Sequence, residues 1–295
     1  MERSVAMRRK VLIFLLALAI GGTALLGMAT CSADRSAATA AAGRQSVELP
    51  IVMYHSVIND PNREGKYIVT PAQLEQDLRY LKERGYTTVT VSEVIAFVNG
   101  TGALPEKPVM ITFDDGNYNN YVYLYPLLEK YDMKAVISVI GLYSDLYSQS
   151  EEAPNANYSN LTWEQMREME ASGRVEIQNH SYNMHGNAGR QGVRQEAGES
   201  SAHYLTAIRE DLEKMQQRME EELGHRASAF AYPFGAVTEE AKQVVREEGI
   251  QATLSSYEHV STVTQGDKES LFDLGRYNRA AGKSAAEFFA TMKIL

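Results

Sequence analysis

Short apolar runs alternate with amphipathic helical patterns throughout residues 47–295, and this alternation constrains the fold more than any other feature of the sequence. The runs that read as strands are Ile51–Tyr54, Tyr86–Val91, Val109–Phe113, Ala135–Ile140, Val175–Gln178, Phe230–Tyr232, Gln251–Leu254 and Phe272–Tyr277. Strands that alternate with helices form parallel βαβ units, and about seven such units suit a barrel. We therefore predict an α/β fold, a distorted (β/α) barrel of about seven parallel strands in a single domain.

Capping signals mark where the intervening helices begin. Thr70-Pro71 provides an N-cap and a first-turn proline, Thr162 begins a capping box, and Ser92 is expected to cap a helix that ends at Val98. In barrels of this class the chemistry gathers at the carboxyl ends of the strands. Polar residues that follow strands are therefore the candidates for a site.

The N-terminus has the layout of an export signal. Arg8-Arg9-Lys10 precede an uncharged, apolar run over Val11–Ala33, which is also long enough to span a bilayer. We predict a signal peptide or a membrane or lipid anchor over residues 1–31 and a flexible linker over 32–46. The only cysteine, Cys31, resembles a bacterial lipid-attachment site, so lipoprotein, cleaved secretion and signal anchor stay open. Each of these three alternatives places residues 47–295 outside the cytoplasm, either secreted or held at the outer face of the cell membrane.

The charge balance excludes some partners. The chain carries a formal net charge of −9, although its first residues are basic. Nucleic acid and anionic lipid headgroups repel such a body, so we expect no nucleic-acid partner and membrane contact only through the N-terminal segment. The sequence does not predict the oligomeric state.

Two adjacent carboxylates follow the strand that ends at Phe113. Asp114 and Asp115 are costly after a buried strand unless a cation or hydrogen bonds offset them. Side chains that are neighbours on an extended chain point opposite ways, so each needs its own partner. One can bind a metal while the other stays free as a base. The alternative is a strand-to-loop turn with a permissive glycine at Gly116.

Two histidines follow the strand that ends at Gln178. His180 and His185 are five residues apart, which fits one face of neither a helix nor a strand, so they converge only if the chain bends. Two histidines and one aspartate form a set that suits a divalent transition metal with open positions. The alternative is two unrelated polar histidines.

Two further segments stand at strand ends. Tyr232-Pro233-Phe234-Gly235 is either a rigid strand-to-helix turn or part of a site, and His55 follows the first strand of the body. A lone histidine there is either a structural hydrogen-bonding residue or a proton donor, since its ordinary pKa is about 6.5.

Together these residues resemble the polysaccharide deacetylase (NodB-homology) family, carbohydrate esterase family four, over about Val47–Phe289. The resemblance implies that Asp114 is the catalytic base, and that Asp115, His180 and His185 hold a divalent metal, expected to be zinc. It also implies a single catalytic domain over residues 47–295.

The five-residue spacing of the two histidines, the N-terminal Tyr54-His55 and the Tyr232-Pro233-Phe234-Gly235 turn resemble the branch that acts on poly-β-1,6-N-acetylglucosamine. In that branch the N-terminal histidine takes the role of the acid, which assigns it to His55. Phe234 and Tyr232 are placed at the oxyanion and the substrate, and the Phe234 backbone N–H is the expected oxyanion donor. Tyr232-Pro233-Phe234-Gly235 is similar to the family's third motif. The arginine of that motif is absent, with Ala231 near its place, and we expect Arg276 to replace it as the partner of Asp114.

The resemblance implies metal-dependent hydrolytic N-deacetylation of an extracellular or cell-wall polysaccharide that contains N-acetylglucosamine, with release of acetate. Deacetylation of peptidoglycan or chitin oligomers is an alternative. A carbohydrate-binding barrel without turnover is another, and the absent arginine favours it. The intact set of two aspartates and two histidines counts against a pure binder, which has no need of a spare base beside a metal.

Overall fold

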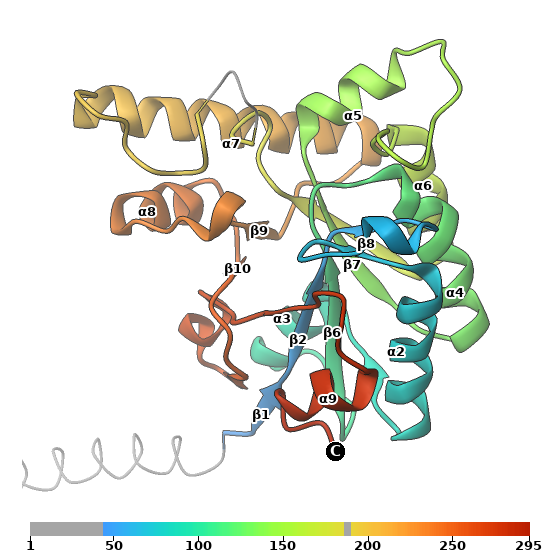
Figure 1. Cartoon of the computed structure of the whole chain (residues 1–295). Helices are drawn as coiled ribbons and strands as arrows, with labels where there is room; N and C mark the ends of the chain where they lie inside the picture. The colour runs from blue at the N-terminus through green and yellow to red at the C-terminus, as the bar shows by residue number, and fades with distance from the viewer. Residues whose placement is uncertain (1–43, 186–189) are drawn as a thin grey trace, which may run out of the picture. The chain divides into compact units, whose positions relative to one another are not determined.

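Strand and helix alternate along the chain in the computed structural model, which describes residues 44–185 and 190–295 (Figure 1). The strands are β1 (Ser46–Leu49), β2 (Ile51–Tyr54), β3 (Ser56–Val57), β4 (Ile68–Val69), β5 (Thr87–Thr88), β6 (Pro108–Phe113), β7 (Ala135–Val139), β8 (Val175–Asn179), β9 (Ala229–Ala231), β10 (Ala252–Leu254), β11 (Ser261–Thr264) and β12 (Tyr277–Asn278). The α-helices are α2 (Pro71–Glu83), α3 (Val91–Val98), α4 (Tyr125–Tyr131), α5 (Gly141–Ser148), α6 (Trp163–Ala171), α7 (Ser201–Leu223), α8 (Glu239–Glu247) and α9 (Ala285–Ala290).

The predicted signal or anchor segment, Cys31 and nearly all of the predicted linker lie outside the described residues. Ser46, the last residue of that linker, is the first residue of β1. Among the helices of the described ranges, none combines the length and the apolar character needed to cross a membrane.

Seven parallel strands form one curled sheet in the order β10-β9-β8-β7-β6-β2-β12. The predicted distorted (β/α) barrel of about seven parallel strands is therefore confirmed. The segment before β12 contacts the opposite edge of the sheet, where Leu274 bridges Leu254 of β10, whereas Tyr277 of β12 itself pairs with Val52 of β2. The last strand is consequently shorter than predicted, Tyr277–Asn278 instead of Phe272–Tyr277, because this segment crosses from one edge to the other.

The helix starts follow local capping chemistry. Thr70 and Thr162 accept hydrogen bonds at the starts of α2 and α6, as expected from the sequence. The predicted Ser92 cap of α3 is wrong. The cap is Thr90, whose hydroxyl accepts from the Glu93 N–H while the Glu93 carboxylate accepts from the Thr90 N–H. This reciprocal pair satisfies two backbone N–H groups at once, which Ser92 cannot do.

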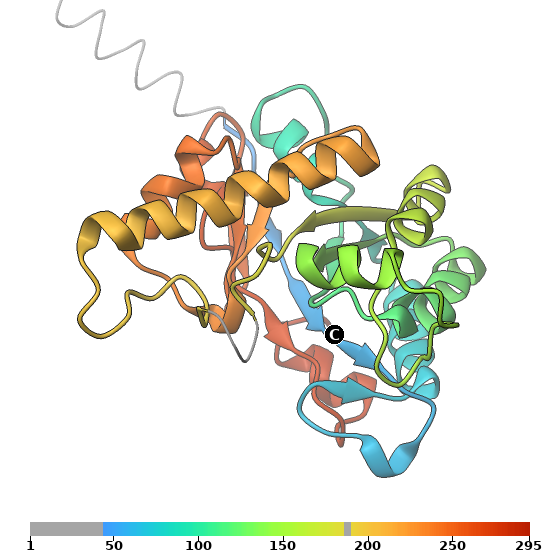
Figure 2. The ribbon, with the colours of Figure 1, turned by 90° about the horizontal axis from the view of Figure 1, so that it is seen from above.

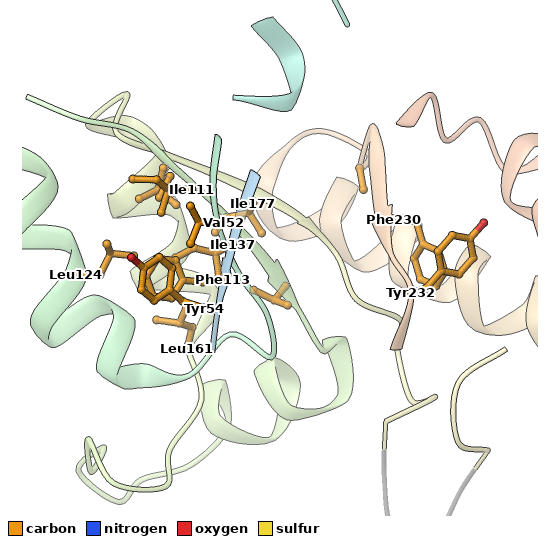
Figure 3. Close-up of a cluster of buried hydrophobic side chains, with 14 of the residues drawn as sticks. Val52, Tyr54, Ile111, Phe113, Leu124, Ile137, Leu161, Ile177, Phe230 and Tyr232 are labelled. Carbon is orange, nitrogen blue, oxygen red and sulfur yellow. The ribbon is translucent and has the colours of Figure 1, made fainter. Parts of the chain in front are cut away.

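Both faces of the sheet are buried. On β2, β6 and β7, consecutive apolar residues enter two different clusters of side chains, because neighbouring side chains on a strand point to opposite faces. One cluster packs against α2, α6 and α7, which flank the curled strands (Figure 2), and the other packs against α3 and β11. Figure 3 shows part of the first cluster, including Val52, Ile111 and Ile137. The packing makes the sheet a rigid frame for the residues at its strand ends.

Candidate active site

Side chains from four strand ends line one cavity of about 270 Å³. His55 follows β2, Asp114 follows β6, His180 follows β8 and Tyr232 follows β9. All of the residues predicted from the sequence line this cavity, namely His55, Asp114, Asp115, His180, His185, Tyr232, Phe234 and Arg276. The parallel sheet brings these residues together, although they are separated by more than 200 positions in the sequence.

Asp114 forms a buried ion pair with Arg276. The two guanidinium NH groups of Arg276 donate to the two carboxylate oxygens of Asp114 at 2.7 and 2.8 Å, and Arg276 Nε donates to the Ser255 carbonyl at 2.8 Å. Burial favours the neutral carboxyl, but the charge of Arg276 and its hydrogen bonds outweigh this effect and hold the pKa of Asp114 below its usual range. Asp114 is therefore a carboxylate at neutral pH. Arg276 reaches it from just before β12, not from a strand end.

Arg276→Met is expected to destabilise the fold by about 3–5 kcal/mol, because it leaves a buried carboxylate without its partner. The loss should be largest at neutral pH. It should shrink as the pH falls towards the ordinary aspartate pKa of about 3.9, where Asp114 of the variant is protonated. Urea unfolding at several pH values measures this loss.

Arg279→Met is the matched control for Arg276→Met. Arg279 forms an equally buried pair with Asp77, 0% exposed on both sides, away from the cavity. Arg279→Met should destabilise the fold to a similar extent and leave the site intact. Equal stability of Arg276→Met and the wild type at pH 7 would contradict the pairing.

Asp115 and the two histidines place three ligand atoms within 4.8 Å of one another. Asp115 Oδ1 lies 3.6 Å from His180 Nε2 and 3.5 Å from His185 Nε2. His180 Nδ1 lies 2.8 Å from the Ala231 carbonyl, which can only accept, so Nδ1 carries the proton and Nε2 presents a lone pair. Burial lowers the pKa of His180, which keeps the ring in the neutral form that metals require.

The three side chains fit a divalent metal. Asp115 Oδ1 is buried and has no hydrogen-bond partner among the described residues. Burial also raises the pKa of Asp115, so a cation bound here would stabilise the charged form of this side chain. Bonds of about 2.0–2.1 Å to a tetrahedral zinc ion place two ligand atoms about 3.3 Å apart, close to the separations from Asp115 Oδ1.

Three residues beside the cavity adopt positive φ without being glycine. Asp115 has φ 74°, Ser181 has φ 77° and Phe234 has φ 57°. Such conformations cost free energy and tend to cluster at functional sites. The glycine after the aspartate pair is needed for space as well, since a Cβ on Gly116 would lie 2.8 Å from Val139 Cγ1. These backbone conformations occur where the chain turns so that the site residues face one cavity.

His55 lies in the cavity in an environment that the sequence does not reveal. Its ring packs against Tyr67, with centroids 4.6 Å apart, and its Nδ1 is buried without a hydrogen-bond partner in the described residues. Burial lowers the pKa of His55 to about 4, although the charge of Asp114 opposes this shift. His55 is thus neutral at pH 7 in the free protein. His55 therefore lacks the ordinary pKa of about 6.5 on which its prediction as a proton donor depends.

Two exposed aromatic rings line the mouth of the cavity. Phe234 is 55% exposed and stacks on His185, with centroids 4.3 Å apart, and Tyr67 is 47% exposed beside His55. Tyr232 is buried in the wall and packs on Phe230. Sequence reasoning misses Tyr67, which belongs to no motif and reaches the site only through the fold. No local signal would have found it.

A larger cavity of about 640 Å³ lies beside α5 and α6. It contains none of the predicted site residues, and its half-buried carboxylate, Asp145, is paired with Arg218. Trp163 in its wall donates to Asp145 from Nε1 at 2.8 Å. Asp145 and Trp163 therefore have partners in this cavity, whereas Asp115 Oδ1 in the smaller one has none among the described residues.

A protein-family model and several known proteins are similar to this chain. Residues 101–253 match the family model for polysaccharide deacetylases, about half of the chain. YxkH of Bacillus subtilis, whose name assigns it to the polysaccharide deacetylases, is 28% identical over 244 residues, 82% of this chain and 75% of that one. The poly-β-1,6-N-acetyl-D-glucosamine N-deacetylase of Escherichia coli K12 is 26% identical over 208 residues, 62% of this chain and 30% of that one. The chain thus spans less than a third of that enzyme.

A solved structure shares the fold. A de-N-acetylase from Aggregatibacter actinomycetemcomitans is 25% identical, with a TM-score of 0.69 over 84% of this chain and 100% of that one. The chain belongs to the polysaccharide deacetylase family. This membership confirms, at the level of the family, the predicted fold and the prediction of a hydrolase that cleaves the acetamide bonds of an N-acetylated polysaccharide.

Proposed function

We propose that this chain removes acetyl groups from N-acetylglucosamine units of an extracellular polysaccharide, and that its substrate is a β-1,6-linked polymer. The observation that carries the proposal is the arrangement of two adjacent aspartates in one cavity. Asp114 is held ionised by an arginine, whereas Asp115 faces two histidines with an Oδ1 that has no hydrogen-bond partner among the described residues. The proposal of a β-1,6-linked substrate is supported by the names of the similar Escherichia coli and Staphylococcus aureus proteins, which are poly-β-1,6-N-acetyl-D-glucosamine N-deacetylases.

Asp115, His180 and His185 would hold the metal, and we expect zinc. When bound, the metal supplies Lewis-acid polarisation of water and of the acetyl carbonyl. Asp114 accepts the proton of the attacking water, and Arg276 keeps it ionised for that purpose.

The remaining residues act on the oxyanion, the amine and the sugar. The Phe234 backbone N–H donates to the developing oxyanion, and Tyr232 shapes the wall beside it. Burial keeps His55 neutral at rest, so it first takes up the proton that Asp114 has accepted from water and then passes it to the leaving amine. Water and the acetamide are thereby converted to acetate and a glucosamine unit. The rings of Tyr67 and Phe234 are placed to stack on the sugar.

Acetate release from a panel of glycans tests the substrate. The panel compares β-1,6-linked N-acetylglucosamine oligomers with chitin oligomers and peptidoglycan fragments of equal length. Release at least tenfold faster from the β-1,6 oligomers is the expected result. Preference for either of the other glycans would assign the chain to the alternative substrate class. Binding of a glycan without acetate release from any of them would support a carbohydrate-binding barrel instead.

His55→Gln is expected to keep the metal and lower kcat by about 10²-fold, the lower end of what a positioned proton donor contributes. A group with a pKa of about 4 has lost its proton by neutral pH, so the pH–rate profile between about pH 6 and 8 should keep its shape. Steady-state kinetics across this range test both points. Wild-type kcat in the variant would leave His55 with a structural role only.

We also propose that the body acts outside the cytoplasm, as the acidic body and the basic, apolar N-terminus indicate. If Cys31 is lipidated, a palmitate analogue should label the wild-type chain and leave Cys31→Ser unlabelled. Equal labelling of both, or labelling of neither, would contradict lipidation and leave cleaved secretion or a signal anchor.

A further inference from the structure

We propose that Asp211, on α7, is a positioning residue that holds the loop between His180 and His185 in the shape required for metal binding. This inference rests on the proposed function, because it takes the two histidines as ligands. Asp211 lies 26 residues beyond His185 and belongs to no motif of the sequence.

The loop needs external support. His180 and His185 are separated by five positions, and the chain bends between them at Ser181, which has φ 77°. The ring of His180 is fixed by its hydrogen bond to the Ala231 carbonyl. No comparable hydrogen bond to His185 Nδ1 exists in the described part of the chain. The place of His185 is therefore set by its stacking on Phe234 and by the backbone of the loop.

Asp211 binds that backbone with both carboxylate oxygens. Its Oδ1 accepts from the Tyr182 N–H and its Oδ2 from the Asn183 N–H, each at 2.7 Å. Hydrogen bonds to a carboxylate are shorter and roughly twice as strong as those between neutral groups. One side chain thus satisfies two consecutive N–H groups at the middle of the bend.

The carbonyls of the same loop are held by a second helix, α5. Gly141 N–H at the start of α5 donates to the Ser181 carbonyl at 3.1 Å, and Leu142 N–H donates to the Tyr182 carbonyl at 2.9 Å. A Cβ on Gly141 would lie 2.7 Å from the Tyr182 ring, so this close approach requires glycine. Hydrogen bonds from α7 and from α5 therefore hold the loop in the absence of a metal.

The helix that carries Asp211 is itself anchored. Ile208, Leu212 and Met215, on the turns around Asp211, are fully buried in the hydrophobic core. Figure 1 shows α7 and α5 at the same end of the sheet. Because its helix is anchored in the core, Asp211 can hold the loop between His180 and His185 in a fixed position. Outer residues that orient metal ligands typically contribute 10–100-fold to metal affinity.

The test measures zinc affinity of the metal-free protein by competition with a chromophoric chelator. Asp211→Asn preserves the size of the side chain but replaces one acceptor with an amide donor. Glu210→Gln is the matched control, the same change of charge on the neighbouring, exposed position of α7. We expect Asp211→Asn to bind zinc about 10–100-fold more weakly, with an unchanged Kd for Glu210→Gln.

Wild-type affinity in a folded Asp211→Asn protein would overturn the inference and leave the proposed function standing. A wild type that binds no zinc would overturn both. If Asp211→Asn fails to fold, amide exchange in the metal-free wild type decides. The Tyr182 and Asn183 N–H groups should be protected there, and exchange as fast as in an exposed loop would overturn the inference.

Discussion

Asp114→Asn is expected to retain the metal and to lose about 10²–10⁴-fold of kcat, the usual contribution of a positioned general base. The amide cannot accept the proton of water, but it preserves the shape of the side chain and one acceptor for Arg276. Asp115, which faces the two histidines, is unchanged in this variant. Metal content and acetate release on the same preparation provide the two readouts.

Asp77→Asn is the control for Asp114→Asn. Asp77 is also a buried aspartate held by an arginine, Arg279, but it does not line the cavity. The control should lose stability and keep kcat below its unfolding temperature. If Asp114→Asn loses its metal together with its activity, the roles assigned to the two aspartates are reversed.

His180→Ala is expected to fold, to contain almost no metal and to release no measurable acetate. Only two of the three protein ligands remain, and catalytic zinc sites typically use three. Elemental analysis and circular dichroism measure metal and fold. His225→Ala is the matched control, because His225 pairs with Glu170 outside the cavity. Full metal occupancy in His180→Ala would remove His180 from the ligand set.

The sheet was predictable because both of its faces are buried. Such strands appear in the sequence as continuous apolar runs, as in Val109–Phe113, and polar residues directly after them stand out. The aspartate pair and the two histidines could be found in this way. The Thr90 cap could also have been found, since Thr90 and Glu93 have the spacing of a capping box.

The features of the fold and the site that the sequence does not predict depend on contacts between distant positions. β1 pairs with β11, more than 200 residues away, and each has only four residues with no distinctive pattern. Tyr67 reaches the cavity, and Asp211 reaches the histidine loop, only after the chain has folded. The lowered pKa of His55 likewise results from burial, which a sequence does not display.

Acetate release from a β-1,6-linked N-acetylglucosamine oligomer, measured on one preparation before chelation, after chelation and after zinc is restored, tests the central claim most directly. We predict release that stops when the metal is removed and returns when zinc is added. Acetate release that continues at the same rate after complete removal of the metal would contradict the assignment of Asp115, His180 and His185 as a catalytic metal site.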